Sequence, residues 1–129
     1  MNREIWEFYV NGQYGVIERW LKTEKISVKE RAKLDAALSR LRTLDRSLIQ
    51  STLLAPIAGT KVHKLRLRCE NRELRPHLCY GPVGNLLDLT FLIGAIEQGD
   101  KPRPPDPELK ADANRKVLLR NPTWRNLFQ

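Results

Sequence analysis

The sequence predicts one α+β domain, residues 1–129, in which a small antiparallel sheet packs against an N-terminal helical hairpin and a C-terminal helix. Three features predict it: a helix-start signature at residue 27, alternation of side-chain character from residue 61, and a nearly unbroken apolar run from residue 86. The predicted order of elements is β-α-α-β-β-β-α. A length of 129 residues suits one domain with its own core.

The N-terminal residues predict a strand followed by a short helix. Residues Ile5–Val10 are rich in aromatic and β-branched side chains and precede Asn11-Gly12, which is typical of a strand that ends in a turn. Apolar residues at helical spacing over 16–21 then predict a helix of about two turns that ends near Thr23.

The next segment carries a clear helix-start signature. Ser27 and Glu30 match a capping box, in which the serine oxygen accepts the Glu30 backbone N–H and the glutamate side chain accepts the serine N–H. An apolar stripe from Ala32 to Leu44 continues this helix, with basic residues on its flanks. We expect the two helices to form a hairpin and the flanking basic residues to face solvent.

From residue 59 the pattern changes to a period of two, which predicts strands. Residues 61–68 form the first, and alternation places Val62, Lys64, Arg66 and Arg68 on one face and Lys61, His63, Leu65 and Leu67 on the other. Residues 74–80 form its antiparallel partner. Pro76 lacks the N–H that a central strand needs, so we expect a bulge or an unpaired edge there.

The remainder of the chain predicts a central strand, a loop and a final helix. The apolar run 86–96 suits a strand buried on both faces, with Gly94 at a bend or a close backbone approach. The proline-rich residues 98–105 predict a semi-rigid loop. Asp106 as the N-cap, with proline as the first helical residue, predicts a helix that ends near Arg120.

The net charge of +8 is concentrated in the middle of the chain. Residues 59–80 hold six basic and two acidic side chains, a net +4, whereas the flanking segments are closer to balance. Such a concentration is typical of a surface that binds a polyanion, and nucleic acid is the commonest one. The alternative is a solvated basic face without a partner.

The composition disfavours several classes of protein. No apolar run approaches the roughly 18 to 20 residues of a membrane-spanning helix, and the opening residues lack the layout of a secretion signal, so we expect a cytosolic protein with no membrane partner. Cys69 and Cys79 cannot form a disulfide framework, and with only His63 and His77 nearby we expect no metal site. Phosphate-loop, hydrolase-elbow and His-Glu-x-x-His motifs are absent.

The charged strand pair is where chemistry is expected. Two adjacent antiparallel strands can aim five side chains into one concave region: Lys64, Arg66, Arg68, Arg75 and His77. A bound anion neutralises such a cluster, and an imidazole with an ordinary pKa can move a proton near neutral pH. Two alternatives stay open. The cations pair locally with Glu70, Glu73 or Asp88, which cancels much of their field, or His77 is an ordinary strand histidine.

The same residues resemble a known family. They are Gly59-Thr60, the strand Lys64-Leu65-Arg66-Leu67-Arg68, Arg75 nine residues after Arg66, the apolar strand 90–95, and a final helix with Asn114-Arg115. Their order and spacing resemble the RelE/HigB-type toxins of toxin-antitoxin systems, and more closely their phage-derived branch. The resemblance covers residues 57–120 by motif and the two N-terminal helices by layout. It implies a small antiparallel sheet that carries a helical hairpin.

The resemblance also implies a function. Members of this family are ribosome-dependent endonucleases that cut mRNA without a metal or other cofactor, by in-line attack of the ribose 2′-hydroxyl on the neighbouring phosphate. A protein antitoxin with a DNA-binding domain silences them. On this chain, Arg66 and Arg68 match the strand-arginine signature, and Arg75 matches the arginine of the next strand. We expect Arg68 and Arg75 to clamp the scissile phosphate, Lys64 or His77 to assist proton transfer, and four cations to bind RNA: Lys61, Arg66, Arg72 and Arg120.

The chain also departs from the family pattern. Residues 94–98, Gly-Ala-Ile-Glu-Gln, stand where relatives carry Gly-Phe and basic residues, and Lys64 stands where relatives often carry glutamate. No tyrosine follows Tyr80 to supply a C-terminal phenolic hydroxyl. Two alternatives to the nuclease therefore stay open. One is a toxin-fold module that binds RNA, or regulates in association with a phage, without efficient cleavage; the other is a basic interaction protein with no nucleic-acid role.

Overall fold

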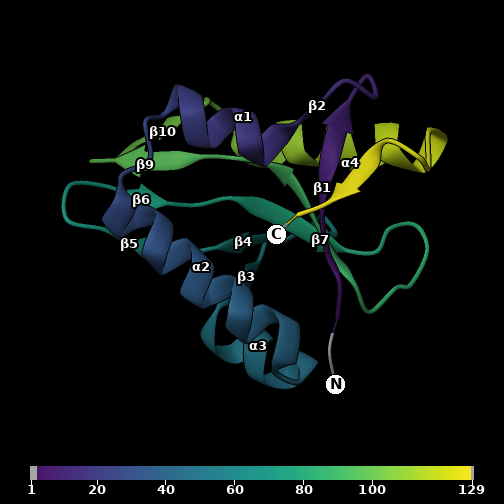
Figure 1. Cartoon of the computed structure of the whole chain (residues 1–129), viewed down its shortest axis with the longest axis horizontal. Coiled ribbons are helices and arrows are strands. Elements are labelled where there is room, and N and C mark those ends of the chain that lie inside the picture. The colour runs from purple at the N-terminus through teal and green to yellow at the C-terminus, as the bar shows by residue number, and fades with distance from the viewer. Residues whose placement is uncertain (1–2, 129) are drawn as a thin grey trace.

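The structure, a computed structural model, describes residues 3–128, except for the side chains of residues 50–52. Four helices and eleven strands lie in this range (Figure 1). In chain order they are β1 (Ile5–Val10), β2 (Tyr14–Gly15), α1 (Val16–Thr23), α2 (Val28–Thr43), α3 (Arg46–Thr52), β3 (Leu54–Pro56), β4 (His63–Leu65), β5 (Leu67–Arg68), β6 (Glu73–Leu74), β7 (His77–Tyr80), β8 (Leu89–Ile93), β9 (Ile96–Gln98), β10 (Lys101–Arg103), α4 (Pro107–Arg120) and β11 (Arg125–Leu127).

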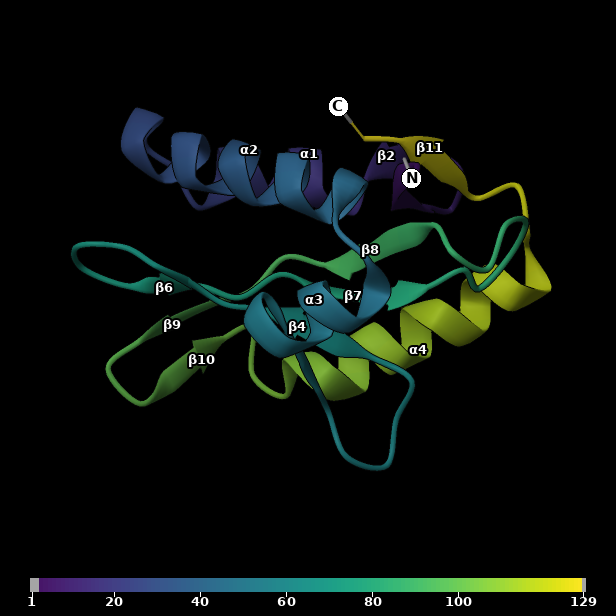
Figure 2. The ribbon, with the colours of Figure 1, turned by 90° about the horizontal axis from the view of Figure 1, so that it is seen from below.

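The strands form two sheets that continue into each other. The larger has the order β11-β1-β8-β7-β4-β3, with β2 beside β1, and only β1 and β8 run parallel among its described pairs. The smaller has the order β10-β9-β6-β5 and projects from the larger as two arms (Figures 1 and 2). Two backbone hydrogen bonds join them, from Leu65 N–H to the Pro76 carbonyl (3.0 Å) and from Arg75 N–H to the Ala95 carbonyl (2.8 Å).

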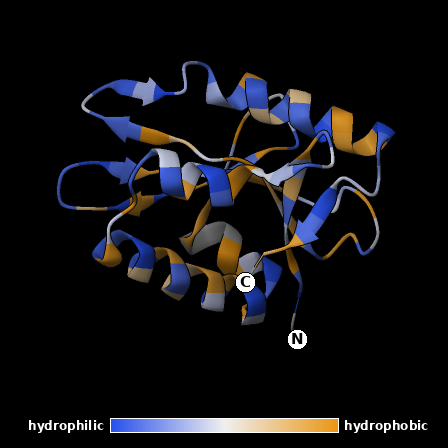
Figure 3. Ribbon diagram, turned by 45° about the horizontal axis from the view of Figure 1, so that its top comes forward, coloured by the Kyte–Doolittle hydropathy of each residue, from blue (hydrophilic) through white to orange (hydrophobic). Residues whose placement is uncertain are grey.

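Helices cover both faces of the large sheet. Helices α1, α2 and α3 share one hydrophobic core with the strands, in which Leu38 and Phe91 are fully buried. Helix α4 covers the opposite face, where Ala111 packs in a second cluster with Val62 and Leu92. Figure 2 shows this layering, and Figure 3 shows that the two arms are mostly hydrophilic. None of the helices in residues 3–128 has the length and apolar character required to cross a membrane.

The α+β class and several individual elements are confirmed. Strand β1 has the predicted bounds, Ile5–Val10, and α1 ends at Thr23. The capping box of α2 is formed by the Ser27 N–H bond to Glu30 Oε1 (2.9 Å) and the Glu30 N–H bond to Ser27 Oγ (3.1 Å). The buried strand expected at 86–96 is present between β1 and β7 but is shorter, since β8 covers Leu89–Ile93 and Leu86 and Leu87 are exposed; α4 ends at Arg120 as expected.

The predicted order and the helical hairpin are not confirmed. Strands β2, β3, β10 and β11 and helix α3 are additional to the predicted elements. Helix α1 packs against β1, β2 and β8 rather than pairing with α2. The physical reason is that Gly94, next to β8, leaves room for the Trp20 side chain, and the Glu7 carboxylate on β1 accepts the Ile17 N–H at the start of α1.

Both basic strands are shorter than predicted. The strand expected at 61–68 is divided into β4 and β5, and the strand expected at 74–80 is divided into β6 and β7. The second interruption falls at Arg75-Pro76, as the missing proline N–H predicts. The register of β7 against β8 also shifts between His77 and Leu78.

The proline-rich segment is not a simple loop. Residues Lys101–Arg103 form β10 and pair with β9, because Gly99 adopts a φ of +64° that permits a tight turn. Asp106 stands at the N-cap of α4 as predicted, but its φ is +50° and its side chain makes no capping hydrogen bond.

Two buried contacts hold α1 on the sheet. Gly94 lies beneath Trp20: a Cβ added at residue 94 would lie 2.1 Å from Trp20 Cγ, which confirms the predicted close approach. The buried carboxylate of Glu7, on β1, accepts the backbone N–H groups of Ile17 (2.9 Å) and Glu18 (3.1 Å) in the first turn of α1. This carboxylate substitutes for a side-chain N-cap.

Candidate functional site

A polar cavity lies where the two sheets meet. It has a volume of about 280 Å³ and is walled by β4, β7, β9 and the start of α4. Lys64 and His77 are direct partners in the antiparallel register of β4 and β7, so their side chains leave the same face of the sheet. Arg75 and Glu97 line the same cavity. The fold therefore brings together three of the four residues predicted to be catalytic. We call this space the junction cavity.

His77 carries a proton-accepting nitrogen that is not committed to another group. The side chain is only 2% exposed, and its Nδ1 lies 2.7 Å from the Arg75 carbonyl oxygen. Because a carbonyl oxygen can only accept, Nδ1 carries the hydrogen and donates it. In the neutral ring Nε2 then holds the lone pair, and it has no hydrogen-bond partner among residues 3–128.

Burial keeps this imidazole neutral. Desolvation is the largest influence and lowers the pKa of His77 below its ordinary value of 6.5. The positive charges of Lys64 and Arg75 lower that pKa further, while the hydrogen bond to the Arg75 carbonyl and the negative charge of Glu108 act in the opposite direction. At neutral pH the ring is therefore uncharged and able to accept a proton.

Lys64 supplies a positive charge beside His77. The side chain is half-buried and forms no ion pair with any carboxylate in residues 3–128. The wall contributed by the start of α4 carries two acids, Asp106 and Glu108, which also line the cavity. Lys64 thus shares the cavity with the neutral imidazole of His77 and with the carboxyl groups of Asp106 and Glu108.

Arg75 is committed to carboxylates of its own chain. Its Nη2 donates to Glu73 Oε2 at 2.7 Å, and its Nη1 forms an ion pair with Glu97 Oε2. Each of these side chains is about one-fifth exposed, so the charge of Arg75 is neutralised inside the site. The expectation that Arg75 offers a free guanidinium to the scissile phosphate is thereby corrected, and the alternative of local pairing with Glu73 applies to this residue.

Arginines and glutamates share the exposed face of the small sheet. Arg68, Glu73 and Glu97 are consecutive partners across β5, β6 and β9, whereas Leu67, Leu74 and Ile96 fill the opposite, buried face. The Arg75 hydrogen bond lowers the pKa of Glu73, and the charges of Arg66 and Arg68 lower it further. Within the described chain, Arg66 and Arg68 are exposed and form no ion pair.

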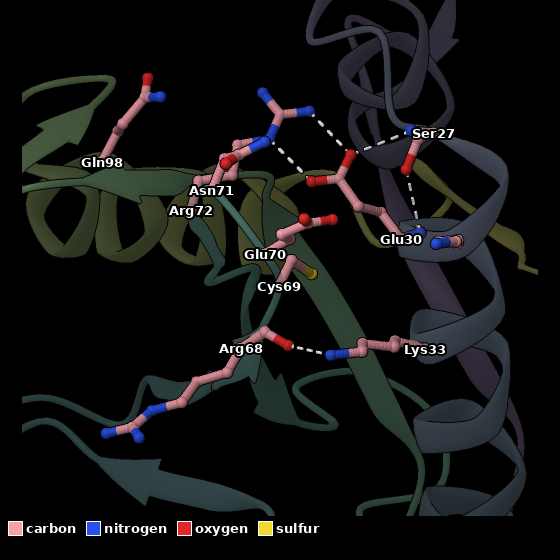
Figure 4. Close-up of a pocket in the computed structure, with 10 residues that line it drawn as sticks. Ser27, Glu30, Lys33, Arg68, Cys69, Glu70, Asn71, Arg72 and Gln98 are labelled. Carbon is pink, nitrogen blue, oxygen red and sulfur yellow. Dashed lines mark hydrogen bonds and ion pairs between the residues drawn. The ribbon is translucent and has the colours of Figure 1, made fainter.

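Arg72 has a structural position. Its Nε lies 2.8 Å from Glu30 Oε2 and its Nη1 lies 3.5 Å from Glu24 Oε1, while Nη2 donates to the Glu24 carbonyl at 3.0 Å. The pairing ties the β5–β6 turn to the start of α2, beside a cavity of about 680 Å³ (Figure 4). The backbone carbonyl of Arg68 accepts a hydrogen bond from Lys33 there, but the Arg68 side chain leads away from α2 (Figure 4). Arg72, predicted to bind RNA, therefore has little charge free for a phosphate.

Of the last two residues predicted to bind RNA, Lys61 lies near the junction cavity and Arg120 lies far from it. Lys61 is exposed three residues before Lys64, close to the junction cavity along the chain. Arg120 is exposed at the end of α4, whereas the cavity is at the start of that helix. At 1.5 Å per residue the helix separates them by about 20 Å. The structure does not bring Arg120 to the site.

The sequence did not predict that three acidic residues, Glu97, Asp106 and Glu108, line the junction cavity. Asp106 and Glu108 entered only as a helix start, and no local signal places them in the same cavity as His77, which lies 29 and 31 positions earlier. Glu97 was noted only as a departure from a family pattern. Glu73 was considered as a local partner of the basic residues, and residues two apart in extended backbone share a face, as Glu73 and Arg75 do here.

Comparison with known proteins gives no assignment: no family model, curated protein or solved structure matches the chain significantly. Within residues 3–128 no group of three or more histidine, cysteine, aspartate or glutamate side chains is arranged to hold a metal ion.

Proposed function

We propose that the chain is a metal-independent endoribonuclease, the toxin of a toxin-antitoxin pair, that cuts mRNA on the ribosome. The observation that carries the proposal is the junction cavity, where the neutral His77 ring with an uncommitted Nε2 faces the same way as the unpaired ammonium of Lys64. In-line cleavage of RNA needs such a pair of proton-transfer groups. The resemblance described above supplies the substrate class and the partner, a protein antitoxin with a DNA-binding domain.

The reaction is an intramolecular transesterification of RNA. His77 Nε2 accepts the proton of the ribose 2′-hydroxyl, and the 2′ oxygen attacks the adjacent phosphorus. The bond between phosphorus and the 5′ oxygen breaks, and Lys64 donates a proton to that leaving oxygen. The products are a 2′,3′-cyclic phosphate and a free 5′-hydroxyl. Lys64 regains its proton and His77 loses its own through solvent.

Arg66 and Arg68 bind the flanking phosphates in this proposal. Both are exposed and form no ion pair in the described chain, and they follow Lys64 by two and four residues, with Arg68 on β5 of the small sheet. Guanidinium groups match phosphate oxygens in a bidentate geometry. This role needs no base-specific contact, because phosphates position a nucleic acid without reading its sequence.

A second candidate is favoured by one specific observation. Arg75, the expected partner of Arg68 at the scissile phosphate, is held by Glu73 and Glu97. Without a third cation the site stabilises less of the charge that develops on the phosphate oxygens. The second candidate is therefore a module of the same fold that binds RNA through Arg66 and Arg68 without cutting it efficiently.

Inducible expression in bacteria separates these functions. The wild-type chain is expected to stop growth and shorten mRNA. His77→Asn keeps a donor for the Arg75 carbonyl but removes the Nε2 base, so it is expected to relieve both effects while the purified variant still binds RNA. Arg66→Ala with Arg68→Ala is expected to relieve both effects by weakening RNA binding. Lys116→Ala, which breaks an exposed pair with Asp112 on α4, is the control and is expected to act like wild type.

Each outcome of this experiment selects or refutes one of the two candidate functions. Growth arrest that persists in the His77→Asn variant refutes the mechanism. Normal growth with the wild-type chain, together with salt-dependent binding to single-stranded RNA, selects the second candidate. Absence of RNA binding at low salt refutes both candidates.

A further inference from the structure

Two like charges face each other across the small sheet. Glu73 of β6 and Glu97 of β9 are direct partners in the antiparallel register, and carboxylates opposite each other on neighbouring strands repel. The Arg75 guanidinium lies between them: it donates a hydrogen bond to Glu73 and forms an ion pair with Glu97, whose Oε2 has no hydrogen-bond partner in the described part of the chain. One cation therefore neutralises half of a paired negative charge, and the three groups together carry a net charge of −1.

The hydrogen bonding around Arg75 is less complete than the hydrogen bonding around Arg72. Arg75 Nε and Glu73 Oε1 are buried and have no hydrogen-bond partner in the described part of the chain. Arg72, by contrast, has two carboxylates and one carbonyl around its guanidinium. When some polar atoms of an ion pair already lack hydrogen-bond partners, exchanging one partner for another anion costs less free energy.

The Arg75 site is also open to an incoming anion. Arg75 and Glu97 are each 21% exposed, and both line the junction cavity with Lys64 and His77. A phosphate placed for attack beside His77 therefore arrives next to the guanidinium that Glu97 occupies. Carboxylate and phosphate are interchangeable partners for arginine, since both accept its parallel N–H bonds.

We propose that the Glu97 carboxylate is a built-in competitor for the RNA phosphate at Arg75. In the resting protein Glu97 forms an ion pair with the guanidinium, which also bonds to Glu73; when RNA binds, a phosphate takes the place of Glu97 on Arg75, and Glu97 turns toward solvent. The inference rests on the proposed function, because it concerns how the same cavity receives its substrate. It makes Glu97 a residue that limits RNA affinity rather than one that supports it.

The test measures binding of a single-stranded RNA with 2′-O-methyl groups, which cannot be cut, by fluorescence anisotropy over a series of KCl concentrations. Glu97→Gln removes the competing charge and keeps the shape of the side chain. Asp35→Asn is the matched control: it also removes one negative charge and frees one arginine, Arg31, but on the exposed side of α2. Arg75→Ala and the double variant Glu97→Gln/Arg75→Ala complete a cycle, and thermal melts check that every variant is folded.

The inference predicts that Glu97→Gln binds RNA roughly fivefold more tightly than Asp35→Asn does, because one more guanidinium meets phosphate. The slope of log K against log salt should steepen by about 0.7, the value for one more single-strand phosphate contact. Both gains should vanish in the double variant. Equal affinities for Glu97→Gln and Asp35→Asn, or a gain that survives loss of Arg75, overturn the inference while RNA binding itself stands. Absence of RNA binding in every variant overturns the proposed function, and this inference with it.

Discussion

Replacing Arg72 with methionine tests whether this residue belongs to the fold or to the RNA-binding surface. The substitution keeps the length of the aliphatic stem and removes the guanidinium that bonds to Glu30 and reaches Glu24. Both Arg72 and Glu30 are about one-seventh exposed in their side chains, at 15% and 12%. The pair is thus shielded from solvent more than an ordinary surface ion pair.

The magnitude follows from the carboxyl group of Glu30. The hydrogen bond from Arg72 is the largest influence that lowers the pKa of Glu30 from an ordinary 4.5 to about 2, and bonds with Ser27 contribute as well. At about 1.4 kcal/mol for each pKa unit, this depression is worth about 3 kcal/mol of unfolding free energy at neutral pH. We assign about 2 kcal/mol of it to Arg72, because the capping box accounts for the rest; for a chain of this length that is about 7 °C in Tm.

The pH dependence has a definite sign. A carboxyl whose pKa is lower in the folded state stabilises the protein above its unfolded pKa of 4.5, and that contribution is lost as the pH falls toward about 2. Urea unfolding between pH 7 and pH 2 should therefore show the wild type and Arg72→Met converging below pH 4.5. Arg31→Met, which breaks an exposed pair with Asp35, is the control and should cost about 0.5 kcal/mol or less. RNA affinity of Arg72→Met should match wild type. A loss below 0.5 kcal/mol at pH 7, or a gap that stays constant down to pH 2, refutes this reasoning.

Three further predictions concern the sheet and the site. Gly94→Ala places a Cβ 2.1 Å from Trp20 Cγ, so the ring must move and the free energy of unfolding in urea should fall by about 3 kcal/mol, the cost of a severe overpacking. An unchanged free energy of unfolding contradicts the close packing. Burial raises the pKa of Glu7, so its charged form weakens folding as the pH rises above 4.5. Glu7→Gln, which still offers an oxygen to the Ile17 N–H, should be the more stable form at pH 7 with the gap closing toward pH 4, and a variant less stable at pH 7 contradicts this. Nitrogen NMR of His77 should show hydrogen on Nδ1 and a titration midpoint below 6.5, and the opposite tautomer would refute the assigned base.

The elements predicted well are those whose signals are local. The Ser27 and Glu30 capping box needs only residues three apart, and the structure forms both of its hydrogen bonds. The missing N–H of Pro76 predicted a bulge or an unpaired edge, and the structure separates β6 from β7 there, with a register shift between His77 and Leu78. Gly94 predicted a close approach without revealing that Trp20 makes it. A local pattern fixes the backbone, while the identity of the partner depends on tertiary packing.

The charges of the site were predicted less well for the same reason. Alternation predicted that Lys64, Arg66 and Arg68 share one face, and the burial of the intervening Leu65 and Leu67 agrees with it, although this segment is divided into β4 and β5 of two sheets. Whether a cation stays free depends on which carboxylates the fold brings near. Arg75 meets Glu97 only because β9 pairs with β6, and Arg72 meets Glu30 only because α2 passes over the β5–β6 turn.

The most direct test is end-group analysis of an RNA incubated with the purified chain and ribosomes. The wild type is predicted to give fragments with a 2′,3′-cyclic phosphate and a free 5′-hydroxyl, and His77→Asn is predicted to lower the cleavage rate by about 10² to 10⁴ with RNA binding retained. Fragments ending in a 5′-phosphate, or equal cleavage by the variant, would contradict the assignment of His77 as the base.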